Sequence, residues 1–362
     1  MYVVMRLKVL FRFGGSMRQS GIAKVQKTWD CYALSYDQAL RGAILLQYPK
    51  QLLEILSSLL SRWLGVHAHL SDLNVNILGY KPGRRCVFEL DFILSLSAVA
   101  PKQHRRVIGK IYANSLGEKV YETLQQLWSH GFAVGRFNIP QPLAYDADWR
   151  LLLMSWTRGN SLDHLLLNGL DDLSKAIIAS AEWLVKLHKC RASERRRHDF
   201  SRLHKLGMWQ RYLGVVYPEA EPLLADVRSR IDLQREALSG WLAAPTHCDY
   251  TPNHLIIDDN QVTGVDFDEF GQYDPLFDVA HFVVHLRYLG LVRLGSLNCF
   301  DWLARLFQDT YKACVDDYSP KRVRLYMVIV YLKLVYFNAF NRPTQDWKKV
   351  VDILLHEARQ IV

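Results

Sequence analysis

The sequence predicts an α+β protein with two lobes, a small antiparallel β-sheet lobe followed by a mainly helical lobe. Runs of β-forming residues joined by short turns lie between residues 75 and 112, whereas apolar residues recur at helical spacing after residue 160. A chain of 362 residues is also long enough for two lobes. We therefore expect residues 1–64 to be an N-terminal extension with helices, 65–156 the sheet lobe and 157–362 the helical lobe.

The composition is that of a globular protein. Hydrophobic residues make up 50% of the chain and charged residues 22%, which excludes a disordered chain. The six cysteines are scattered without a Cys-x-x-Cys pair, so we expect neither a zinc site nor a disulfide framework, and a cytoplasmic location. The net charge of +9 admits a nucleic acid or an acidic membrane surface, but it equally suits a protein that holds a nucleotide. No nucleic-acid-binding module is recognisable, so no such partner is expected.

Two apolar segments bear on targeting and membrane insertion. Met1–Phe13 contains three basic residues and no uninterrupted apolar stretch follows it, so a signal peptide is not expected. Tyr326–Phe340 is the most apolar run, but Lys333 interrupts it and the run is too short to span a bilayer. We expect no membrane insertion and a buried helix in the second lobe.

The N-terminal segment predicts two helices. Apolar residues recur at helical spacing from Asp37 to Leu64, and Pro49 divides the segment. We expect these helices to pack on the side of the sheet lobe. A helical hairpin that binds a partner is the alternative.

Three strands are expected next. Val75–Leu78 leads into a turn over Gly79–Arg85, Cys86–Leu96 alternates between apolar and polar residues, and Arg105–Tyr112 is the third strand. Lys110 lies in this third strand among residues that should face the core or the sheet. Its ammonium group therefore needs an anionic partner.

Helices dominate the remainder. Glu118–His130 is a predicted helix, Trp149–Trp156 a strand, and Leu173 to Leu187 form one helical stripe. The basic stretch 189–205 either attracts an anionic partner or is a solvated loop. Three more helices are expected over Phe300–Tyr318, Arg322–Phe340 and Asp346–Val362.

The stretch from Thr246 to Ala280 carries the candidate chemistry. Two short apolar β-runs flank a polar turn and predict a hairpin. Asp249 precedes the hairpin and Asp266 follows it, so the hairpin should bring the two carboxylates together. Such a pair suits phosphoryl transfer, in which one carboxylate orients the accepting hydroxyl and the other holds a magnesium ion that bridges nucleotide phosphates.

This stretch resembles the catalytic core of the aminoglycoside phosphotransferase and choline kinase-like families, which are small-molecule relatives of the protein kinases. Their pattern is His-x-Asp, an Asn five residues after that Asp, a hairpin ending in Asp-Phe, and Asp-Pro-x-x-Asp at the start of a helix. The chain matches it with His247, Asp249, Asp266, Asp274, Pro275 and Asp278. The resemblance runs roughly from Leu78 to Phe340 and implies a two-lobed protein kinase-like fold.

The resemblance assigns roles at the reacting end of the site. Asp249 would orient the acceptor hydroxyl, with His247 bracing its loop, and Asp266 would bind Mg²⁺. Asp274 and Asp278 are expected to be structural, Asp274 as the cap of a helix that Pro275 opens and Asp278 as an acceptor of backbone hydrogen bonds.

The second metal position is where the chain departs from the pattern. His254 stands in place of the expected Asn, and the nearest Asn is Asn253, one position early. Neutral imidazole is a poorer magnesium ligand than an amide oxygen. Three outcomes stay open: His254 contacts phosphate, Asn253 replaces it, or one metal suffices. Asp268 either contacts the metal, or supports the residues that hold it, or is a solvated turn carboxylate.

The resemblance also implies a nucleotide site in the first lobe. Lys110 would reach the phosphates of ATP or GTP, and Glu118 or Glu122 would pair with it unless both are surface charges. Two further sets are implied: Arg84 or Arg85 as a phosphate grip, and Met154, Ser155 and Trp156 as the adenine pocket.

The implied function is transfer of the terminal phosphate of a nucleotide to a hydroxyl of a small molecule. A sugar, an amino alcohol and an aminoglycoside-like compound are the candidate acceptors, and the basic character of the chain gives no support for a polycation. The alternative is a catalytically silent nucleotide-binding or scaffold protein, which the His254 departure motivates. The acceptor, the choice between ATP and GTP, and the oligomeric state do not follow from the sequence.

Overall fold

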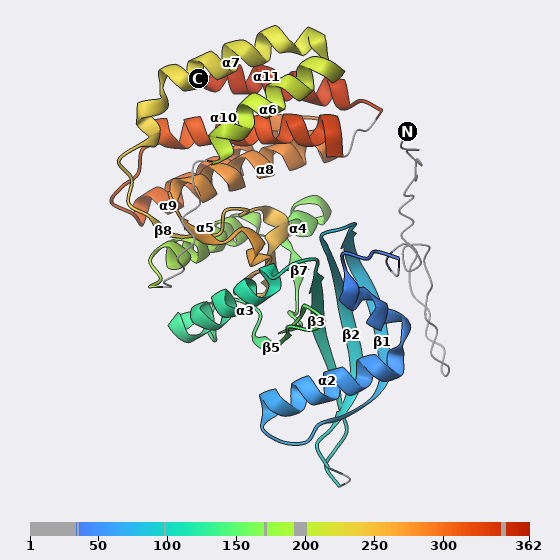
Figure 1. The fold of residues 1–362 in the computed structure, drawn as a ribbon. Coiled ribbons are helices and arrows are strands. Elements are labelled where there is room, and N and C mark those ends of the chain that lie inside the picture. Colours follow the sequence, from blue (N-terminus) through green and yellow to red (C-terminus); the bar gives the residue numbers. More distant parts are fainter. Residues whose placement is uncertain (1–33, 35, 98, 170–171, 192–200, 342–344) are drawn as a thin grey trace.

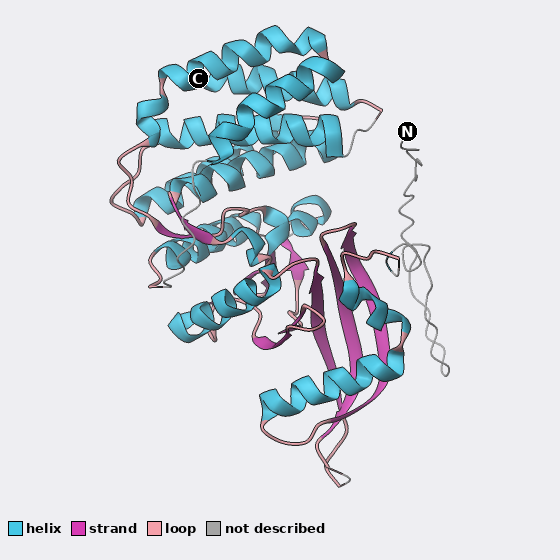
Figure 2. Cartoon of the chain, viewed as in Figure 1, coloured by secondary structure: helices cyan, strands magenta, loops and turns pink. Residues whose placement is uncertain are grey.

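The structure has a sheet lobe and a helical lobe, which lies above it in Figure 1. It is a computed structural model that describes residues 34, 36–97, 99–169, 172–191, 201–341 and 345–362. Most of the strand length is in the lower lobe and most helices are in the upper one (Figure 2). The described part of the chain therefore has the predicted α+β arrangement. The first residues and the middle of the basic stretch 189–205 lie outside the described residues.

Among the described residues, five antiparallel strands form the sheet of the first lobe in the order β1-β2-β3-β6-β5. Their bounds are His69–Lys81 (β1), Arg85–Ser95 (β2), Gln103–Tyr112 (β3), Pro142–Asp146 (β5) and Leu151–Ser155 (β6). The sequence did not predict β5, because it is short and starts at a proline. Strands β2 and β3 pair with Val87 opposite Lys110, which fixes the face that Lys110 occupies.

Helix α2, Pro49–Leu64, follows a 3-10 helix over Arg41–Gln47 and crosses the sheet (Figure 1). It begins at the predicted break, because proline suits the first turn of a helix. Its buried stripe consists of Leu52, Leu56, Leu59 and Leu60. These leucines share one core with alternate residues of β2: Cys86, Phe88, Leu90, Phe92 and Leu94. The N-terminal helices therefore pack on the sheet lobe, as expected.

Helix α3, Leu116–Leu127, links the lobes. Its buried residues Val120, Leu124 and Leu127 belong to the core of the helical lobe and not to the core under α2. The α-helix ends three residues before the predicted His130, and a π-helical turn continues it over Trp128–Phe132. The first lobe is thus anchored to the second along this helix.

The helical lobe surrounds the acid-bearing stretch. Its helices are α4 (Leu162–Asn168), α5 (Leu173–His188), α6 (Ser201–Val216), α7 (Glu221–Leu233), α8 (Leu276–Leu294), α9 (Asp301–Ala313), α10 (Pro320–Tyr336) and α11 (Trp347–Ile361). Its short strands are β7 (Asn160–Ser161), β8 (Ala244–Thr246), β9 (Leu255–Asp258), β10 (Gln261–Gly264) and β11 (Gly271–Tyr273), with β4 (Phe137–Asn138) joined to β10. The predicted hairpin is the antiparallel pair β9–β10.

Helix α10 is the apolar segment of the second lobe. With the turn that follows it, the helix spans Pro320–Phe340, which among the described residues is the one stretch long and apolar enough to cross a membrane. The prediction that the segment is too short is therefore wrong for the helix as a whole. However, 72% of the apolar window is buried inside the fold, as in the core helix of a globular protein. The expected buried helix is confirmed.

Candidate active site

The loop that carries Asp249 is held by the start of α8. The carboxylate of Asp278 accepts hydrogen bonds from the backbone N–H groups of His247, at 2.7 Å, and Cys248, at 2.8 Å. Cys248 has a φ of 62° and Asp266 a φ of 64°, both in the left-handed region. Such backbone persists only where its surroundings hold it. The expected structural role of Asp278 is confirmed.

Asp274 links the start of α8 to α10. Its carboxylate accepts a hydrogen bond from the Leu276 N–H at 3.0 Å and from the Tyr326 hydroxyl at 2.9 Å, and the Arg322 guanidinium lies 2.9 Å away. The helix itself begins at Leu276, so Asp274 caps it from two residues before its first residue. The side chain acts as the predicted cap and also as an anchor for a second helix.

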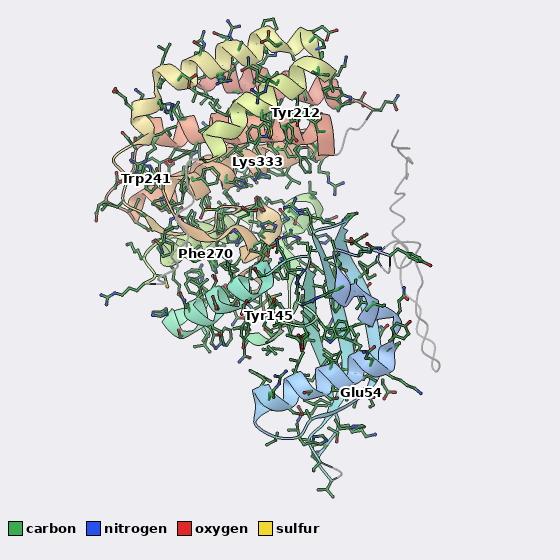
Figure 3. The ribbon with its side chains drawn as sticks, in the orientation of Figure 1. Glu54, Tyr145, Tyr212, Trp241, Phe270 and Lys333 are labelled. Carbon is green, nitrogen blue, oxygen red and sulfur yellow. The ribbon has the colours of Figure 1, made fainter. Side chains whose placement is uncertain are left out.

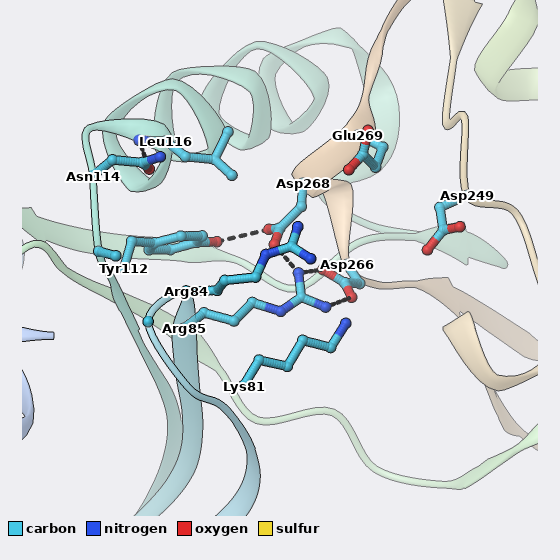
Figure 4. Close-up of a pocket in the computed structure, with 12 residues that line it drawn as sticks. Lys81, Arg84, Arg85, Tyr112, Asn114, Leu116, Asp249, Asp266, Asp268 and Glu269 are labelled. Atoms are coloured by element: carbon cyan, nitrogen blue, oxygen red, sulfur yellow. Dashed lines mark hydrogen bonds and ion pairs between the residues drawn. The ribbon is translucent and has the colours of Figure 1, made fainter. Parts of the chain in front are cut away.

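The two predicted carboxylates converge. Asp249 and Asp266 line one cavity of about 160 Å³, and Figure 4 shows them on its wall. The imidazole of His254 lies between them, with Nδ1 3.9 Å from Asp249 Oδ2 and Nε2 3.6 Å from Asp266 Oδ2. The β9–β10 hairpin therefore brings the two carboxylates together, as its short length predicts. The chain enters and leaves the hairpin at the same end.

The ring of His254 has an orientation fixed by a backbone contact. Its Nδ1 lies 2.8 Å from the backbone carbonyl of Asp249, so Nδ1 carries the proton and donates it. Nε2 is then directed at Asp266. Asn253, by contrast, has an exposed side chain that accepts a hydrogen bond from the Thr251 hydroxyl at 2.7 Å. Of the two residues, His254 is the one directed at the carboxylate pair.

Asp266 and Asp268 share the cations of the first lobe. Lys110 Nζ donates to Asp266 at 2.7 Å and to Asp268 at 2.6 Å, and Arg85 contacts both carboxylates. Burial alone would raise the pKa of Asp266, but Lys110, His254 and Arg85 outweigh it and hold the pKa below its ordinary value. Burial also lowers the pKa of Lys110 to about 8. Asp266 is thus ionised, as a hard metal ligand must be.

The structure corrects the expected partner of Lys110. Glu118 and Glu122 both lie on the exposed side of α3, and the Lys110 ammonium reaches Asp268 in their place. Asp268 is only 7% exposed and also accepts a hydrogen bond from the Tyr112 hydroxyl at 2.8 Å. It is therefore not a solvated carboxylate. Asp268 is thus the anionic partner of Lys110, a role that the sequence assigned to Glu118 or Glu122.

His247 is a bracing residue by its contacts. Its Nε2 lies 3.0 Å from the carbonyl oxygen of Val265, and its ring packs against Phe267 with centroids 4.9 Å apart. The side chain is fully buried, and burial lowers its pKa, so the imidazole is neutral near pH 7. It joins the loop of Asp249 to the strand end before Asp266.

A second cavity, of about 490 Å³, lies between the lobes beside the carboxylates. It is lined by the predicted adenine-pocket residues Met154, Ser155 and Trp156 and by Lys110 and Asp266. The guanidinium of Arg106 lies 3.6 Å from the centroid of the Trp156 ring and covers it. The apolar part of this cavity thus continues into the charged part, which suits a flat base joined to phosphates.

The two arginines of the β1–β2 turn differ. Arg85 is directed at the acids, with Nη2 3.0 Å from Asp266 Oδ2, whereas Arg84 lines the smaller cavity. The turn is tied to the N-terminal segment, because the Asp37 carboxylate accepts hydrogen bonds from the Gly83 N–H at 2.6 Å and the Tyr80 hydroxyl at 2.9 Å. In this structure Arg85 contacts a carboxylate where the sequence predicts a phosphate.

Sequence reasoning missed the groups that surround Asp249. Lys333 Nζ on α10 lies 3.3 Å from Asp249 Oδ1, and His281 Nε2 on α8 lies 3.5 Å from the same oxygen. His285, one turn further along α8, stacks on His281 with centroids 4.4 Å apart. The available signal was the single charged residue, Lys333, in the apolar run Tyr326–Phe340, since a charge there needs a partner.

The side chains of the site fit a magnesium ion held by one or two protein ligands better than a metal held by protein ligands alone. No group of three or more His, Cys, Asp or Glu side chains within the described ranges is arranged to hold a metal. Magnesium usually takes one or two carboxylates and completes its shell with phosphates and water. The ionised Asp266, at the junction of both cavities, meets that requirement, with His254 as its neighbour.

The known structures share this fold. A thermostable mutant of aminoglycoside phosphotransferase APH(4)-Ia, in a complex with ADP and hygromycin B, matches with a TM-score of 0.57 at 15% identity, over 84% of this chain and 98% of that chain. The GDP complex of aminoglycoside 2'-phosphotransferase-IIIa gives 0.54 at 15%, over 85% and 98%. A choline/ethanolamine kinase family protein from Mesorhizobium loti gives 0.51 at 15%, over 75% and 84%. At these identities the matches establish the protein kinase-like fold.

The sequence comparisons identify the family. No curated protein matches the chain significantly. The model of the phosphotransferase enzyme family (APH), however, matches residues 99–299, which contain Lys110, the hairpin and both carboxylates. The chain belongs to the phosphotransferase enzyme family.

Proposed function

We propose that this protein transfers the terminal phosphate of ATP or GTP to a hydroxyl group of a small molecule. The observation that carries the proposal is the convergence of Asp249 and Asp266 on one cavity, with Lys110 reaching Asp266 from the sheet lobe. Solved structures of the same fold contain ADP or GDP, which supports a nucleotide in the neighbouring cavity. The six cysteines are scattered along the sequence without a Cys-x-x-Cys pair, which supports a cytoplasmic enzyme.

Asp249 would act on the acceptor. Burial raises its pKa, but Lys333 and the neighbouring imidazoles more than offset this and keep the pKa well below its ordinary value. The ionised carboxylate accepts a hydrogen bond from the acceptor hydroxyl and aims its oxygen at the terminal phosphorus. As the new P–O bond forms, the bond to the leaving nucleoside diphosphate breaks, and the hydroxyl proton passes through Asp249 to solvent.

The other charged groups would serve the nucleotide. Asp266 would hold Mg²⁺, which when bound neutralises negative charge on the phosphates. Lys110 and Arg85 would donate to phosphate oxygens once a nucleotide enters, and Asp268 would keep Lys110 in position. Position and charge neutralisation account for most of the rate in this reaction type, so these contacts are the expected means of catalysis.

Two substitutions test the proposal. Asp249→Asn should lower phosphate transfer by about 10²-fold or more but leave the nucleotide affinity within a few-fold, because the group acts on the acceptor. Asp266→Asn should remove the magnesium-dependent part of nucleotide binding. Calorimetry with ATP and magnesium measures binding, and release of ADP in the presence of candidate acceptors measures transfer.

A matched control is Asp259→Asn, at the exposed turn of the same hairpin, which should change neither quantity. Equal nucleotide affinities in the Asp249 and Asp266 variants would contradict the assignment. So would a wild-type protein that transfers phosphate to no acceptor and gains that activity only with His254→Asn, since this is the behaviour of a silent relative.

A further inference from the structure

Three polar side chains of the helical lobe gather beside Asp249 and are not among the residues that line either cavity. They are Lys333 on α10, which Figure 3 labels, and His281 and His285 on α8. Lys333 lies 3.3 Å from Asp249 and 3.2 Å from His281 Nε2. The helix that carries Lys333 is otherwise almost wholly buried and apolar from Val323 to Val335. A lysine at this position therefore destabilises the folded protein unless its charge has a partner.

Lys333 retains hydrogen-bonding capacity. His281 Nδ1 lies 3.2 Å from the carbonyl oxygen of Tyr250, so Nδ1 carries the proton and Nε2 accepts from Lys333. An ammonium group has three N–H donors, of which Asp249 and His281 take two. No third partner exists within the described ranges, and the Lys333 side chain is 41% exposed. One donor of a full positive charge is therefore left beside Asp249, on a side chain that solvent reaches.

His285 adds a second unfilled group. Its Nε2 is buried and has no hydrogen-bond partner in the part of the chain that the structure describes. Burial and the nearby Lys333 lower the pKa of His285 to about 3, so the ring is neutral at physiological pH. A buried polar atom without a partner is destabilising, which favours a ligand atom that completes it.

Lys333 is the full positive charge beside Asp249. It comes first among the groups that lower the pKa of Asp249, followed by the imidazoles of His281, His254 and His285, with no carboxylate among them. An acceptor with an ammonium group beside its reacting hydroxyl would meet Lys333 at close range and be repelled. An acceptor with an anionic group would satisfy the third donor.

We propose that Lys333, with His285 beside it, forms an anion subsite, and that the acceptor is a hydroxylated molecule with a carboxylate or phosphate group near the reacting hydroxyl. This inference rests on the proposed function, because it concerns the acceptor side of the same Asp249. The anionic group binds Lys333, a neighbouring polar group of the acceptor meets His285, and the hydroxyl meets Asp249. The transfer step itself is unchanged: the hydroxyl oxygen gains the P–O bond and the nucleoside diphosphate leaves.

The first experiment measures binding, so it does not need the natural acceptor. The protein is saturated with magnesium and a non-hydrolysable ATP analogue, and four probes of one carbon frame are titrated by calorimetry: gluconate, glucose 6-phosphate, glucitol and glucamine. Gluconate or glucose 6-phosphate should bind at least about tenfold more tightly than glucitol and glucamine, as one charge-assisted hydrogen bond provides. The two anionic probes show whether the subsite favours carboxylate or phosphate.

Substitutions then assign the preference. Lys333→Met should weaken the better anionic probe at least about tenfold more than it weakens glucitol, whereas Lys333→Arg, which keeps the charge, should retain the preference. Lys349→Met, an exposed lysine of α11, is the control and should have no effect. Steady-state transfer to the probes that serve as acceptors should show the Lys333→Met loss in KM more than in kcat.

The outcomes separate the two claims. Tighter binding of glucamine, failure of both anionic probes to bind, or an equal loss for all probes in Lys333→Met would overturn the anion subsite. The last result would mean that Lys333 is only the counter-ion that positions Asp249. Lys333-dependent anion binding without any phosphate transfer would support the subsite and count against the proposed function alone.

Discussion

The three carboxylates of the site differ in their neighbours, and the neighbours separate their roles. Asp249 is 30% exposed and faces Lys333 and the imidazoles, so an acceptor can reach it. Asp266 is 19% exposed and lies where both cavities meet. Asp268 is 7% exposed and already filled by Lys110, Tyr112 and Arg85. Accessibility therefore supports the proposed chemical roles of Asp249 and Asp266 and a positioning role for Asp268.

The first prediction concerns the partner of Lys110. Asp268→Asn should lower nucleotide affinity by about tenfold, because Lys110 loses a charge-assisted hydrogen bond that directs it to the phosphates. The free energy of unfolding should fall by about 1–3 kcal/mol, the usual effect of weakening a buried charged contact. Calorimetry with ATP and magnesium and urea unfolding measure the two quantities.

Glu118→Gln is the matched control for this prediction. Glu118 lies on the exposed side of α3, so its neutralisation should leave both quantities within a factor of two of wild type, or about 0.4 kcal/mol. The reverse pattern, a large loss for Glu118→Gln and none for Asp268→Asn, would restore the helix glutamate as the partner of Lys110.

The second prediction concerns acid stability. Unfolded, His285 has the ordinary pKa of 6.5, but folded it has a pKa of about 3, so the unfolded chain takes up this proton first as pH falls. The stability linked to His285 is complete above pH 6.5 and is lost between pH 6.5 and 3. At pH 5 the loss amounts to about 2 kcal/mol.

His285→Phe keeps a ring against His281 and cannot take up a proton. The decrease in unfolding free energy between pH 7 and pH 5, from urea titrations, should therefore be smaller than in wild type by about 1–2 kcal/mol. An unchanged pH dependence would show that the ring is already protonated, or solvated, in the folded protein.

For single residues, the sequence predicted the positions of those that are placed by segments close to them in the chain. Asp249 and Asp266 converge because a short hairpin joins them, and Asp278 reaches the loop from the helix that follows. Lys333 and His285 could not be assigned, because which face of α8 or α10 meets Asp249 depends on how these long helices pack. The partner of Lys110 was misassigned for a related reason, because the sequence does not show whether Lys110 reaches a glutamate of α3 or Asp268.

Elements with strong periodicity were predicted well, and those with weak patterns were not. β2 alternates perfectly in burial and α2 has a clear leucine stripe, so both were expected near their observed bounds. β1 begins at His69, six residues before the predicted start. Its first half is polar and lacks a clear strand pattern, and it is held by pairing with β2 along one edge. β5 has five residues and lacks an alternating pattern. Tertiary pairing, not local pattern, forms such strands.

The third prediction tests what α2 is for. Leu56 is fully buried under the sheet, so Leu56→Ala should lower the unfolding free energy by about 2–5 kcal/mol. Glu54→Ala, on the exposed side of the same helix, should change it by less than about 0.5 kcal/mol. Urea unfolding followed by circular dichroism measures both. A helix that serves only to bind a partner would tolerate both changes equally.

The two lobes meet through an apolar anchor and a charged contact of different kinds. On one side, α3 places Val120, Leu124 and Leu127 in the core of the helical lobe, and that contact is apolar and buried. On the other, Arg85 and Lys110 of the sheet lobe bind Asp266 across the cavity. The second contact uses the carboxylate that the proposed metal would need. Under the proposed function, loading of the site would exchange a guanidinium for a metal ion and a phosphate.

The last prediction follows from that exchange. Without a nucleotide, Arg85 competes with metal for Asp266, because its Nη2 lies 3.0 Å from Oδ2. Arg85→Gln should raise the affinity of the nucleotide-free protein for Mn²⁺, a paramagnetic substitute for Mg²⁺, by about tenfold, a small part of the Coulomb energy of such a contact. The same change should weaken ATP binding, since the arginine is no longer available to the phosphates. Electron paramagnetic resonance titration measures free Mn²⁺, and Arg84→Gln, which lines the same cavity, is the control. If Mn²⁺ affinity is the same in both variants and in wild type, Arg85 does not compete with metal for Asp266.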